Sequence, residues 1–317
     1  MALDSATTAF LAAAAEAAGS DAKPMWHMEP LEARAASAGM DAMFGTGPEM
    51  HRTEDHMLTG IDGGQFEVRV HVPVAEPQGV FVYLHGGGWV ISNIDSFDTL
   101  GRQLAEKSGC AVVLVNYRKA PESQYPIAVE DSWTALRWAD ENMEQLAGKR
   151  VPLFVGGDSA GGNLSAVVAL RARDNKGPEL AKQILIYPVT DADFTRGSYL
   201  EEENQTLLTT EFMEWFWNHY APNTADRAHH EASPLRAESL EGVAPALVIT
   251  AAHDVLRDEG EAYAQRLKES GVRTEQLRWP GQMHGFFSMV NVLPAAAEAM
   301  DFVVQSVRAE LKKEAAK

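Results

Sequence analysis

A serine lies between two glycines in the string Gly157-Asp158-Ser159-Ala160-Gly161. An apolar run precedes this string and a helical pattern follows it. In a strand–turn–helix context, G-x-S-x-G holds the serine hydroxyl on a tight turn above a sheet, where it can act as a nucleophile. The helix N-terminus then favours negative charge beside the serine. G-x-S-x-G is also common in loops that have no catalytic role. The prediction that Ser159 is catalytic therefore depends on the apolar run before the string and the helical pattern after it.

Glycines occupy three consecutive positions after His85, in the string "HGGGW" at residues 85–89. Glycine in a strand-like segment costs stability, so a run of three needs a reason. Attack on a carbonyl creates an oxyanion, which needs backbone N–H donors that no side chain obstructs. Upstream of G-x-S-x-G, this string is the esterase form of that device. The predicted donors are Gly87, Gly88 and Ala160. A phosphate-binding loop is disfavoured, because no Gly-Lys-Ser/Thr or G-x-G-x-x-G opening a helix follows.

A catalytic serine needs an acid and a base. In folds that carry a G-x-S-x-G turn, both come after the nucleophile in the chain, first Asp or Glu and then His. His284 lies in "WPGQMHGFFSM", between the last predicted strand and the final helix. Asp254 lies just past the apolar run 245–252, and we predict it as the acid. Asp258 is the nearest competitor, but it is expected on a helix. His253 is interpreted as structural.

Three further residues are assigned to substrate binding. Trp89 follows the glycine run and is predicted to wall the pocket, and Asp158 precedes the nucleophile. His85 either contacts substrate or supports the glycine loop through a hydrogen bond. The pair His229 and His230 has no Cys, Asp or Glu at metal-ligand spacing, so we expect a solvated loop there and no metal site. The chemistry needs no cofactor.

The elements that must position these residues alternate between strands and helices. Short apolar runs rich in Val, Ile and Leu are typical of parallel strands that are covered on both faces. Helical patterns lie between them, which predicts an α/β fold with a mostly parallel central sheet flanked by helices. The predicted strands are 65–73, 79–85, 110–117, 152–157, 183–189, 245–252 and 272–280.

Two segments fall outside this alternation. Residues 1–48 are rich in Ala, Met and Glu and predict one or two helices. Residues 190–235 are aromatic and acidic, and they are too long for a connecting loop. We expect helices there that lie outside the sheet and pack on the N-terminal helices as a lid. Their aromatic and Met side chains offer apolar surface, of which some should line the pocket.

Composition restricts the partners. The chain has 317 residues, with 27 Lys and Arg against 45 Asp and Glu, so its net charge is −18. Such a surface repels phosphate backbones and anionic lipid, which argues against nucleic acid and membrane partners. The N-terminus lacks a basic region before its apolar stretch, and no stretch of apolar residues is long enough to span a bilayer. With a single cysteine, the chain is predicted to be cytoplasmic.

Taken together, the motifs resemble the hormone-sensitive-lipase-like family of α/β-hydrolases, which includes many bacterial carboxylesterases. The resemblance extends over about 200 residues in the family's order, from residue 85 to residue 286. Two positions depart from the usual pattern: Val255 stands where proline is common after the acid, and Lys119 stands where an apolar residue is usual. The matching strings are "HGGGW", "NYRKAPE" with Pro126 and Asp131, "GDSAGGNL", "DVLRDEGEAYAQRL" and "HGF".

This resemblance implies the triad Ser159, Asp254 and His284. It also implies a helical cap of residues 1–48 and 190–235 on a catalytic domain of residues 49–189 and 236–317. The implied activity is hydrolysis of short- to medium-chain acyl esters through an acyl-enzyme. Amide or lactone hydrolysis at the same site stays open. A non-catalytic binding protein is the other alternative, because plant gibberellin receptors are similar to this family yet lack a complete triad. Some members form homodimers through the last strand and the closing helix, so the resemblance implies a homodimer through residues 272–280 and the stretch around 295–311.

Overall fold

An eight-stranded sheet forms the centre of the protein in the computed structural model, which describes residues 2–19 and 23–315. The strand order is β1-β2-β4-β3-β5-β6-β7-β8. β2 runs antiparallel to both β1 and β4, and the remaining neighbours are parallel. The mostly parallel sheet is thus confirmed. The strands are β1 Arg52–Thr59, β2 Gln65–Val72, β3 Val80–Leu84, β4 Ala111–Asn116, β5 Leu153–Asp158, β6 Leu180–Ile186, β7 Ala246–His253 and β8 Thr274–Met283.

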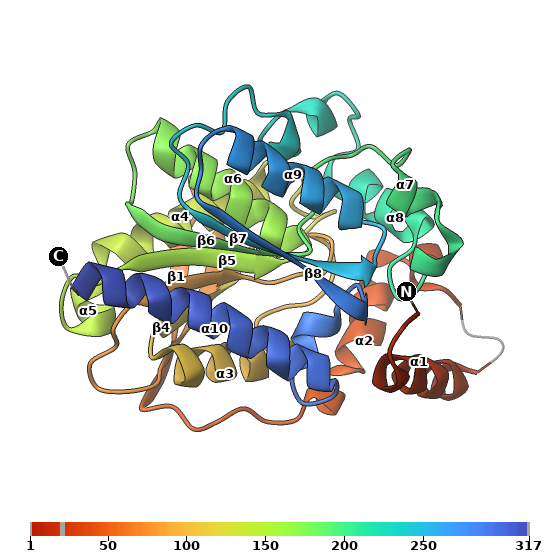
Figure 1. Ribbon diagram of the computed structural model, residues 1–317, viewed down its shortest axis with the longest axis horizontal. Coiled ribbons are helices and arrows are strands. Elements are labelled where there is room, and N and C mark those ends of the chain that lie inside the picture. The colour runs from red at the N-terminus through yellow and green to blue at the C-terminus, as the bar shows by residue number, and fades with distance from the viewer. Residues whose placement is uncertain (1, 20–22, 316–317) are drawn as a thin grey trace.

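Helices cover both faces of the sheet (Figure 1). On one face lie α3 (Asp98–Ser108) and α10 (Pro294–Ala315), and on the other α4 (Ile127–Glu141), α6 (Ala160–Asp174) and α9 (Arg257–Glu269). Every residue of β3 and β5 is consequently buried. Double burial explains why these strands read as continuous apolar runs rather than as alternating patterns.

The helical segment between β4 and β5 is divided in the structure. It forms α4, which ends at Glu141 and is capped by Asn142, and then the short helix α5 (Met143–Ala147). The Asn142 side-chain amide donates to the carbonyl of Trp138, so it satisfies an acceptor in the last turn of α4. Such local side-chain bonds make asparagine a helix terminator.

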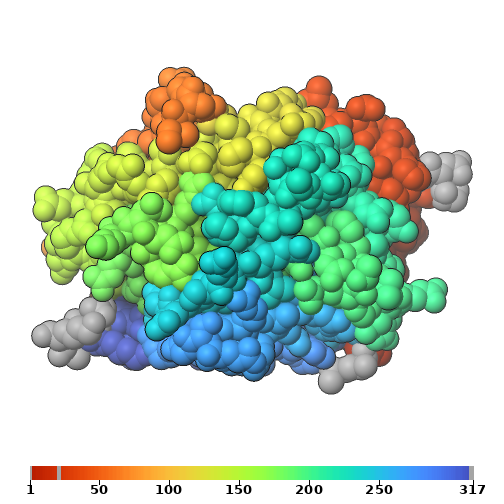
Figure 2. Space-filling view, turned by 90° about the horizontal axis from the view of Figure 1, so that it is seen from above, coloured from red at the N-terminus to blue at the C-terminus, as the bar shows by residue number. Residues whose placement is uncertain are grey.

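Beyond the carboxyl ends of the parallel strands lie the two segments that interrupt the alternation (Figure 1). Residues 20–22 of the first segment lie outside the described chain, as does residue 1. Trp26 of the first segment contacts Phe212 of the second, with ring centroids 5.7 Å apart. In Figure 2 the red-to-orange N-terminal atoms border the green-to-turquoise inserted segment. The first segment contains α1 Ser5–Ala18, η1 Met25–His27, α2 Pro30–Ala38 and η2 Asp41–Phe44, and the second contains α7 Gly197–Leu200, η3 Glu202–Asn204, α8 Thr210–Tyr220, η4 Asp226–Ala228 and η5 Pro234–Arg236.

Within the described residues, the helices are either too short or too polar to cross a bilayer.

Candidate active site

Three side chains from three separate loops form one hydrogen-bonded line at the carboxyl edge of the sheet. The Oγ atom of Ser159 lies 3.0 Å from Nε2 of His284. Nδ1 of that ring lies 2.8 Å from Oδ2 of Asp254. All three side chains are buried, and Asp254 is fully so. With Nδ1–H donating to the carboxylate, Nε2 accepts from the serine hydroxyl, which is the arrangement that activates a serine.

Ser159 occupies the strained turn that its flanking glycines predict. Its φ is +55°, in the region that non-glycine residues rarely adopt. A Cβ at Gly157 would lie 2.1 Å from the carbonyl oxygen of Leu84, and one at Gly161 would lie 1.8 Å from the same oxygen. Both positions therefore require glycine, because β3 passes too close for any side chain. α6 begins at the next residue, Ala160.

The acid loop after β7 is held by several contacts. The second carboxylate oxygen of Asp254, Oδ1, accepts from the N–H of Leu256 at 2.9 Å. The carbonyl of Val255 accepts from the Ser198 hydroxyl at 2.6 Å, so the inserted segment ties down the position where proline is usual. The competitor Asp258 lies on α9, where its carboxylate accepts from the N–H of Ser198. It is therefore directed toward the inserted segment, and it has no contact with His284.

The histidine loop is anchored by a helix from the start of the chain. Gln282, two residues before His284, is fully buried at the end of β8. Its side-chain amide accepts from the Thr7 hydroxyl at 3.0 Å and donates to the Asp4 carboxylate at 2.6 Å. The N–H of Asp4 also donates to the carbonyl of Gly281. This anchor leaves no local signal in the sequence, because Asp4 and Gln282 are separated by 278 residues.

Residues 86–88, which contain predicted oxyanion donors and are called the oxyanion loop, form a glycine loop after β3. Gly87 and Gly88 have φ of +106° and +56°, which favour glycine. Among the residues that the structure describes, the N–H groups of Gly87, Gly88 and Ala160 donate to no backbone acceptor in a turn or loop. A Cβ at Gly88 would lie 2.2 Å from the ring of Phe216 on α8. The inserted segment thus packs directly on the loop.

His85 supports this loop from inside the protein. Its Nδ1 lies 2.6 Å from the carbonyl oxygen of Gly86, and its ring stacks on Tyr117 at 4.4 Å. Burial, with a smaller effect of the Lys119 charge, lowers the pKa of His85 to about 3, so the imidazole is neutral and donates this bond. The Tyr117 hydroxyl donates to the carbonyl of His85 itself. These contacts match the supporting role that sequence analysis left open.

Asp158 and Trp89, both predicted to bind substrate, make contacts within the protein. The Asp158 carboxylate accepts from the Tyr83 hydroxyl and from the N–H of Gly86, both at 2.9 Å. Burial raises the pKa of Asp158 to about 6. Trp89 is fully buried, with its ring parallel to that of Tyr220 at 4.1 Å. Substrate contact by Asp158, Trp89 and His85 stays a prediction, and none of the three is more than 4% exposed here.

Lys119, the unusual cation of the "NYRKAPE" string, is partly buried near the oxyanion loop. Its Nζ donates to Oδ1 of Asn116 at 3.0 Å. Burial and then the Arg34 guanidinium lower the pKa of Lys119 from 10.5 to about 8, against the effect of Glu122. Because the folded state binds this proton less tightly than the unfolded state, the charge destabilises the fold below about pH 8. The penalty disappears as the pH rises from about 8 to 10.5.

A Lys119→Leu variant is therefore expected to melt about 2 °C higher than the wild type at pH 7. The gain should shrink when both proteins are melted at pH values between 8 and 10, because the wild-type amine is then neutral. Differential scanning calorimetry across this range measures the effect. Lys119→Arg, which keeps the charge, is the control and should show no gain. An equal gain at pH 7 and pH 10 would contradict this account.

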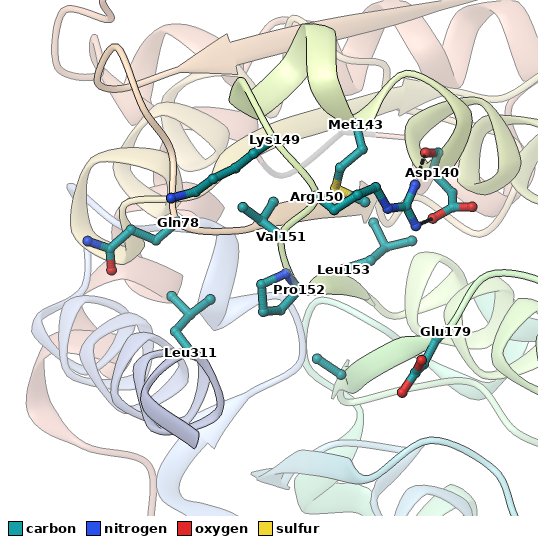
Figure 3. Close-up of a pocket in the computed structure, with 11 residues that line it drawn as sticks. Gln78, Asp140, Met143, Lys149, Arg150, Val151, Pro152, Leu153, Glu179 and Leu311 are labelled. Atoms are coloured by element: carbon teal, nitrogen blue, oxygen red, sulfur yellow. Dashed lines mark hydrogen bonds and ion pairs between the residues drawn. The ribbon is translucent and has the colours of Figure 1, made fainter. Parts of the chain in front are cut away.

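A separate cavity of about 610 Å³ opens at the opposite, amino edge of the sheet (Figure 3). Lys149 and Arg150 lie at its rim, and Arg150 pairs with Asp140. Pro152 and Leu153, at the start of β5, form part of its apolar wall. Because β5 ends at Asp158, the length of the strand separates this cavity from the serine.

Comparisons with known proteins agree with the fold and the motifs. The family described as "alpha/beta hydrolase fold" matches residues 81–288. The chain is 41% identical over 259 residues to the carboxylesterase NlhH of Mycobacterium tuberculosis, which covers 80% of each protein. It is 36% identical to an ethyl acetate hydrolase of Pseudomonas putida, over 91% of this chain and 92% of that protein. A solved thermostable esterase from Pseudomonas putida ECU1011 superposes with a TM-score of 0.89 at 37% identity, covering 98% of both chains.

Proposed function

The chain belongs to the alpha/beta hydrolase fold family, and on that premise we propose that it is a serine carboxylesterase acting on small-molecule esters. The observation that carries the proposal is the continuous contact from Ser159 through His284 to Asp254. The N–H groups of Gly87 and Gly88, which donate to no backbone acceptor within the described turns and loops, support it. The named esterases among its relatives support the same activity.

Acylation follows from the positions of the hydrogen bonds. His284 takes the hydroxyl proton at Nε2 while Oγ of Ser159 bonds to the ester carbonyl carbon. Asp254 stabilises the imidazolium and holds its tautomer. The negative charge that develops on the carbonyl oxygen is stabilised by the N–H groups of Gly87, Gly88 and Ala160. When the tetrahedral intermediate collapses, the bond to the alcohol oxygen breaks, and the alcohol leaves with the proton from Nε2.

Deacylation repeats these steps with water. Nε2 of His284 removes a proton from a water molecule as its oxygen bonds to the acyl carbon of Ser159. The same N–H donors stabilise the second oxyanion. Collapse breaks the bond to Oγ, the proton returns to the serine, and the carboxylic acid is released. The groups named here account for each proton transfer in both half-reactions.

We further propose that residues 1–48 and 190–235 form a cap that limits the acyl chain. Phe216 packs on Gly88 and stacks on Phe212 at 4.2 Å, and Phe212 contacts Trp26. An aromatic layer drawn from both segments therefore covers the oxyanion loop. Such a cover leaves little room for a long acyl chain beside the serine. One relative is named an ethyl acetate hydrolase, which supports a short acyl group.

A p-nitrophenyl ester series from acetate to palmitate tests this proposal. We expect kcat/KM to be highest among acetate, butyrate and octanoate. Palmitate should be about 100-fold poorer, because an acyl chain that the cap obstructs displaces its carbonyl from Ser159. Palmitate turnover equal to that of butyrate would contradict the proposed cap limit while leaving the esterase activity in place.

The same assay separates the alternatives. A receptor-like protein would hydrolyse none of these esters although folded. An amidase or lactonase would prefer p-nitroanilides or lactones over the matched esters. The intact line from serine to carboxylate argues for chemistry, since a binding protein has no need of that alignment. A cytoplasmic location and a homodimer through β8 and α10 remain predictions, and the position of β8 at the edge of the sheet supports the second.

A further inference from the structure

An arginine of the N-terminal segment donates hydrogen bonds to backbone carbonyls close to the oxyanion loop in the chain. Arg34 lies on α2, and its side chain is 22% exposed. Its Nε donates to the carbonyl of Val90 at 2.8 Å, and its Nη2 donates to the carbonyl of Ala120 at 2.8 Å. The outer edge of the guanidinium makes two bonds to the Glu122 carboxylate. Four of the five N–H groups of this planar group are therefore engaged.

The Val90 carbonyl connects Arg34 to the oxyanion donors through consecutive peptide units. That carbonyl belongs to the peptide that carries the N–H of Ile91. The Ile91 N–H donates to the carbonyl of Gly87 at 2.9 Å. The Gly87 carbonyl in turn belongs to the peptide that carries the N–H of Gly88, a proposed oxyanion donor. One charged group is thus linked to the reacting oxygen through two hydrogen-bonded peptides.

Two further bonds hold the same loop. The N–H of Val90 also donates to the Gly87 carbonyl, at 3.0 Å. The N–H of Ala120 donates to the carbonyl of Trp89 at 2.9 Å, so the residue whose carbonyl accepts from Nη2 of Arg34 is also bonded to the segment after the oxyanion loop. Arg34 therefore restrains the segment after the glycines in two ways. It bonds directly to Val90, and it bonds to Ala120, which in turn bonds to Trp89.

We propose that Arg34 is a positioning residue for the oxyanion hole, which aligns and polarises the N–H of Gly88 through the Val90–Ile91 and Gly87–Gly88 peptides. The inference rests on the proposed esterase function. Peptides in a hydrogen-bonded chain polarise one another, and a cation at the carbonyl end of the chain strengthens the donor at the other end. An oxyanion donor acts mainly on the transition state, so the effect falls on kcat rather than on KM.

The arginine fork explains why this position suits no other cation. Guanidinium presents several N–H groups in one plane and can bond two carbonyls and a carboxylate together. A lysine ammonium is a point charge that reaches one of the two carbonyls at a time. Lys119 lies nearby with the same sign, and the Glu122 carboxylate balances both charges. Arg34→Lys should therefore retain the charge and lose the alignment.

Steady-state kinetics with p-nitrophenyl acetate test the proposal on the full chain. We expect Arg34→Ala to lower kcat about tenfold, which is a fraction of the 10²–10³-fold effect of losing a whole oxyanion donor. KM should change less than about twofold. Arg34→Lys should lie between Arg34→Ala and the wild type. Guanidinium ion at a non-denaturing concentration should restore part of the kcat of Arg34→Ala, because it can occupy the vacated position.

Arg266 supplies the matched control, since it also grips two backbone carbonyls, those of Leu235 and Ala237, away from the oxyanion loop. Arg266→Ala should lower the melting temperature as much as Arg34→Ala does, while its kcat stays at the wild-type value and does not respond to guanidinium.

Equal kcat losses in the two Ala variants, without rescue in either, would overturn the positioning role and leave only a structural one. If Arg34→Ala does not fold, a wild-type kcat in folded Arg34→Lys would overturn it likewise. Absence of turnover by the wild type would overturn the proposed function as well, whereas normal turnover by both wild type and Arg34→Ala would overturn this inference alone.

Discussion

A Ser159→Ala variant is expected to lose ester hydrolysis by a factor on the order of 10⁴ to 10⁶ while remaining folded. The Ser159 hydroxyl lies 3.0 Å from Nε2 of His284, within reach of the proposed general base. Its removal leaves binding and oxyanion stabilisation without a covalent route. The measurement is kcat for p-nitrophenyl acetate, together with mass spectrometry after treatment with a phosphonate ester. The wild type should take up one phosphonyl group at Ser159, and the variant none.

Ser132 provides the matched control for this substitution. It is also a fully buried serine, and its hydroxyl donates to the Ala128 carbonyl within α4, away from the triad. Ser132→Ala should keep wild-type kcat and accept the phosphonate. If Ser159→Ala retained activity within about tenfold of the wild type, the nucleophile would have to be another residue.

An Asp254→Asn variant is expected to lower kcat by about 10⁴-fold with little change in the structure. The Asp254 carboxylate fixes the proton of His284 on Nδ1, because it accepts that bond at 2.8 Å. An asparagine amide that donates to Nδ1 would favour the other tautomer, with its proton on Nε2. The imidazole would then be unable to accept from Ser159. The imidazolium formed during attack would also lose its compensating charge.

Asp258→Asn tests the same step from the competing position. Asp258 is only four residues away, yet its carboxylate bonds to Ser198 and to Arg257. Its substitution should cost less than about tenfold in kcat, with most of the effect in stability. A larger loss for Asp258→Asn than for Asp254→Asn would identify Asp258 as the acid and reverse the assignment. Both variants need only the p-nitrophenyl acetate assay and a thermal melt.

Short stretches of sequence were enough to predict the elements that hold the proposed site. β3 ends at the oxyanion loop, β5 just before Ser159, and β7 just before Asp254. Helices cover both faces of these strands, so their apolar composition alone predicted them. The glycines around Ser159 are dictated by backbone contact with Leu84, which is why their pattern is readable in the sequence. The order of nucleophile, acid and base follows from the fold. These features depend on a few neighbouring residues each.

Other features of the structure could not be predicted from short stretches of sequence. β1 was not recognised as a separate strand because it lies at the sheet edge and alternates between partly buried and exposed positions, in the polar string "RTEDHMLT". The contacts of Arg34 with Val90 and of Gln282 with Asp4 join segments far apart in the chain. The stacking of Trp89 on Tyr220 of α8 likewise joins distant segments, and contact of Trp89 with substrate stays a prediction. Tertiary packing decides each of these cases.

The cavity at the amino edge of the sheet has a practical consequence for handling the protein. Lys149 is exposed there, whereas Ser159, His284 and Asp254 lie at the carboxyl edge of the sheet. Attachment to a resin confined to position 149 would orient each molecule with Ser159 toward the solution. A fluorophore placed at this position would likewise report on tumbling without obstructing the path of an ester. The surface suited to attachment and the proposed active site therefore lie at opposite ends of the same sheet.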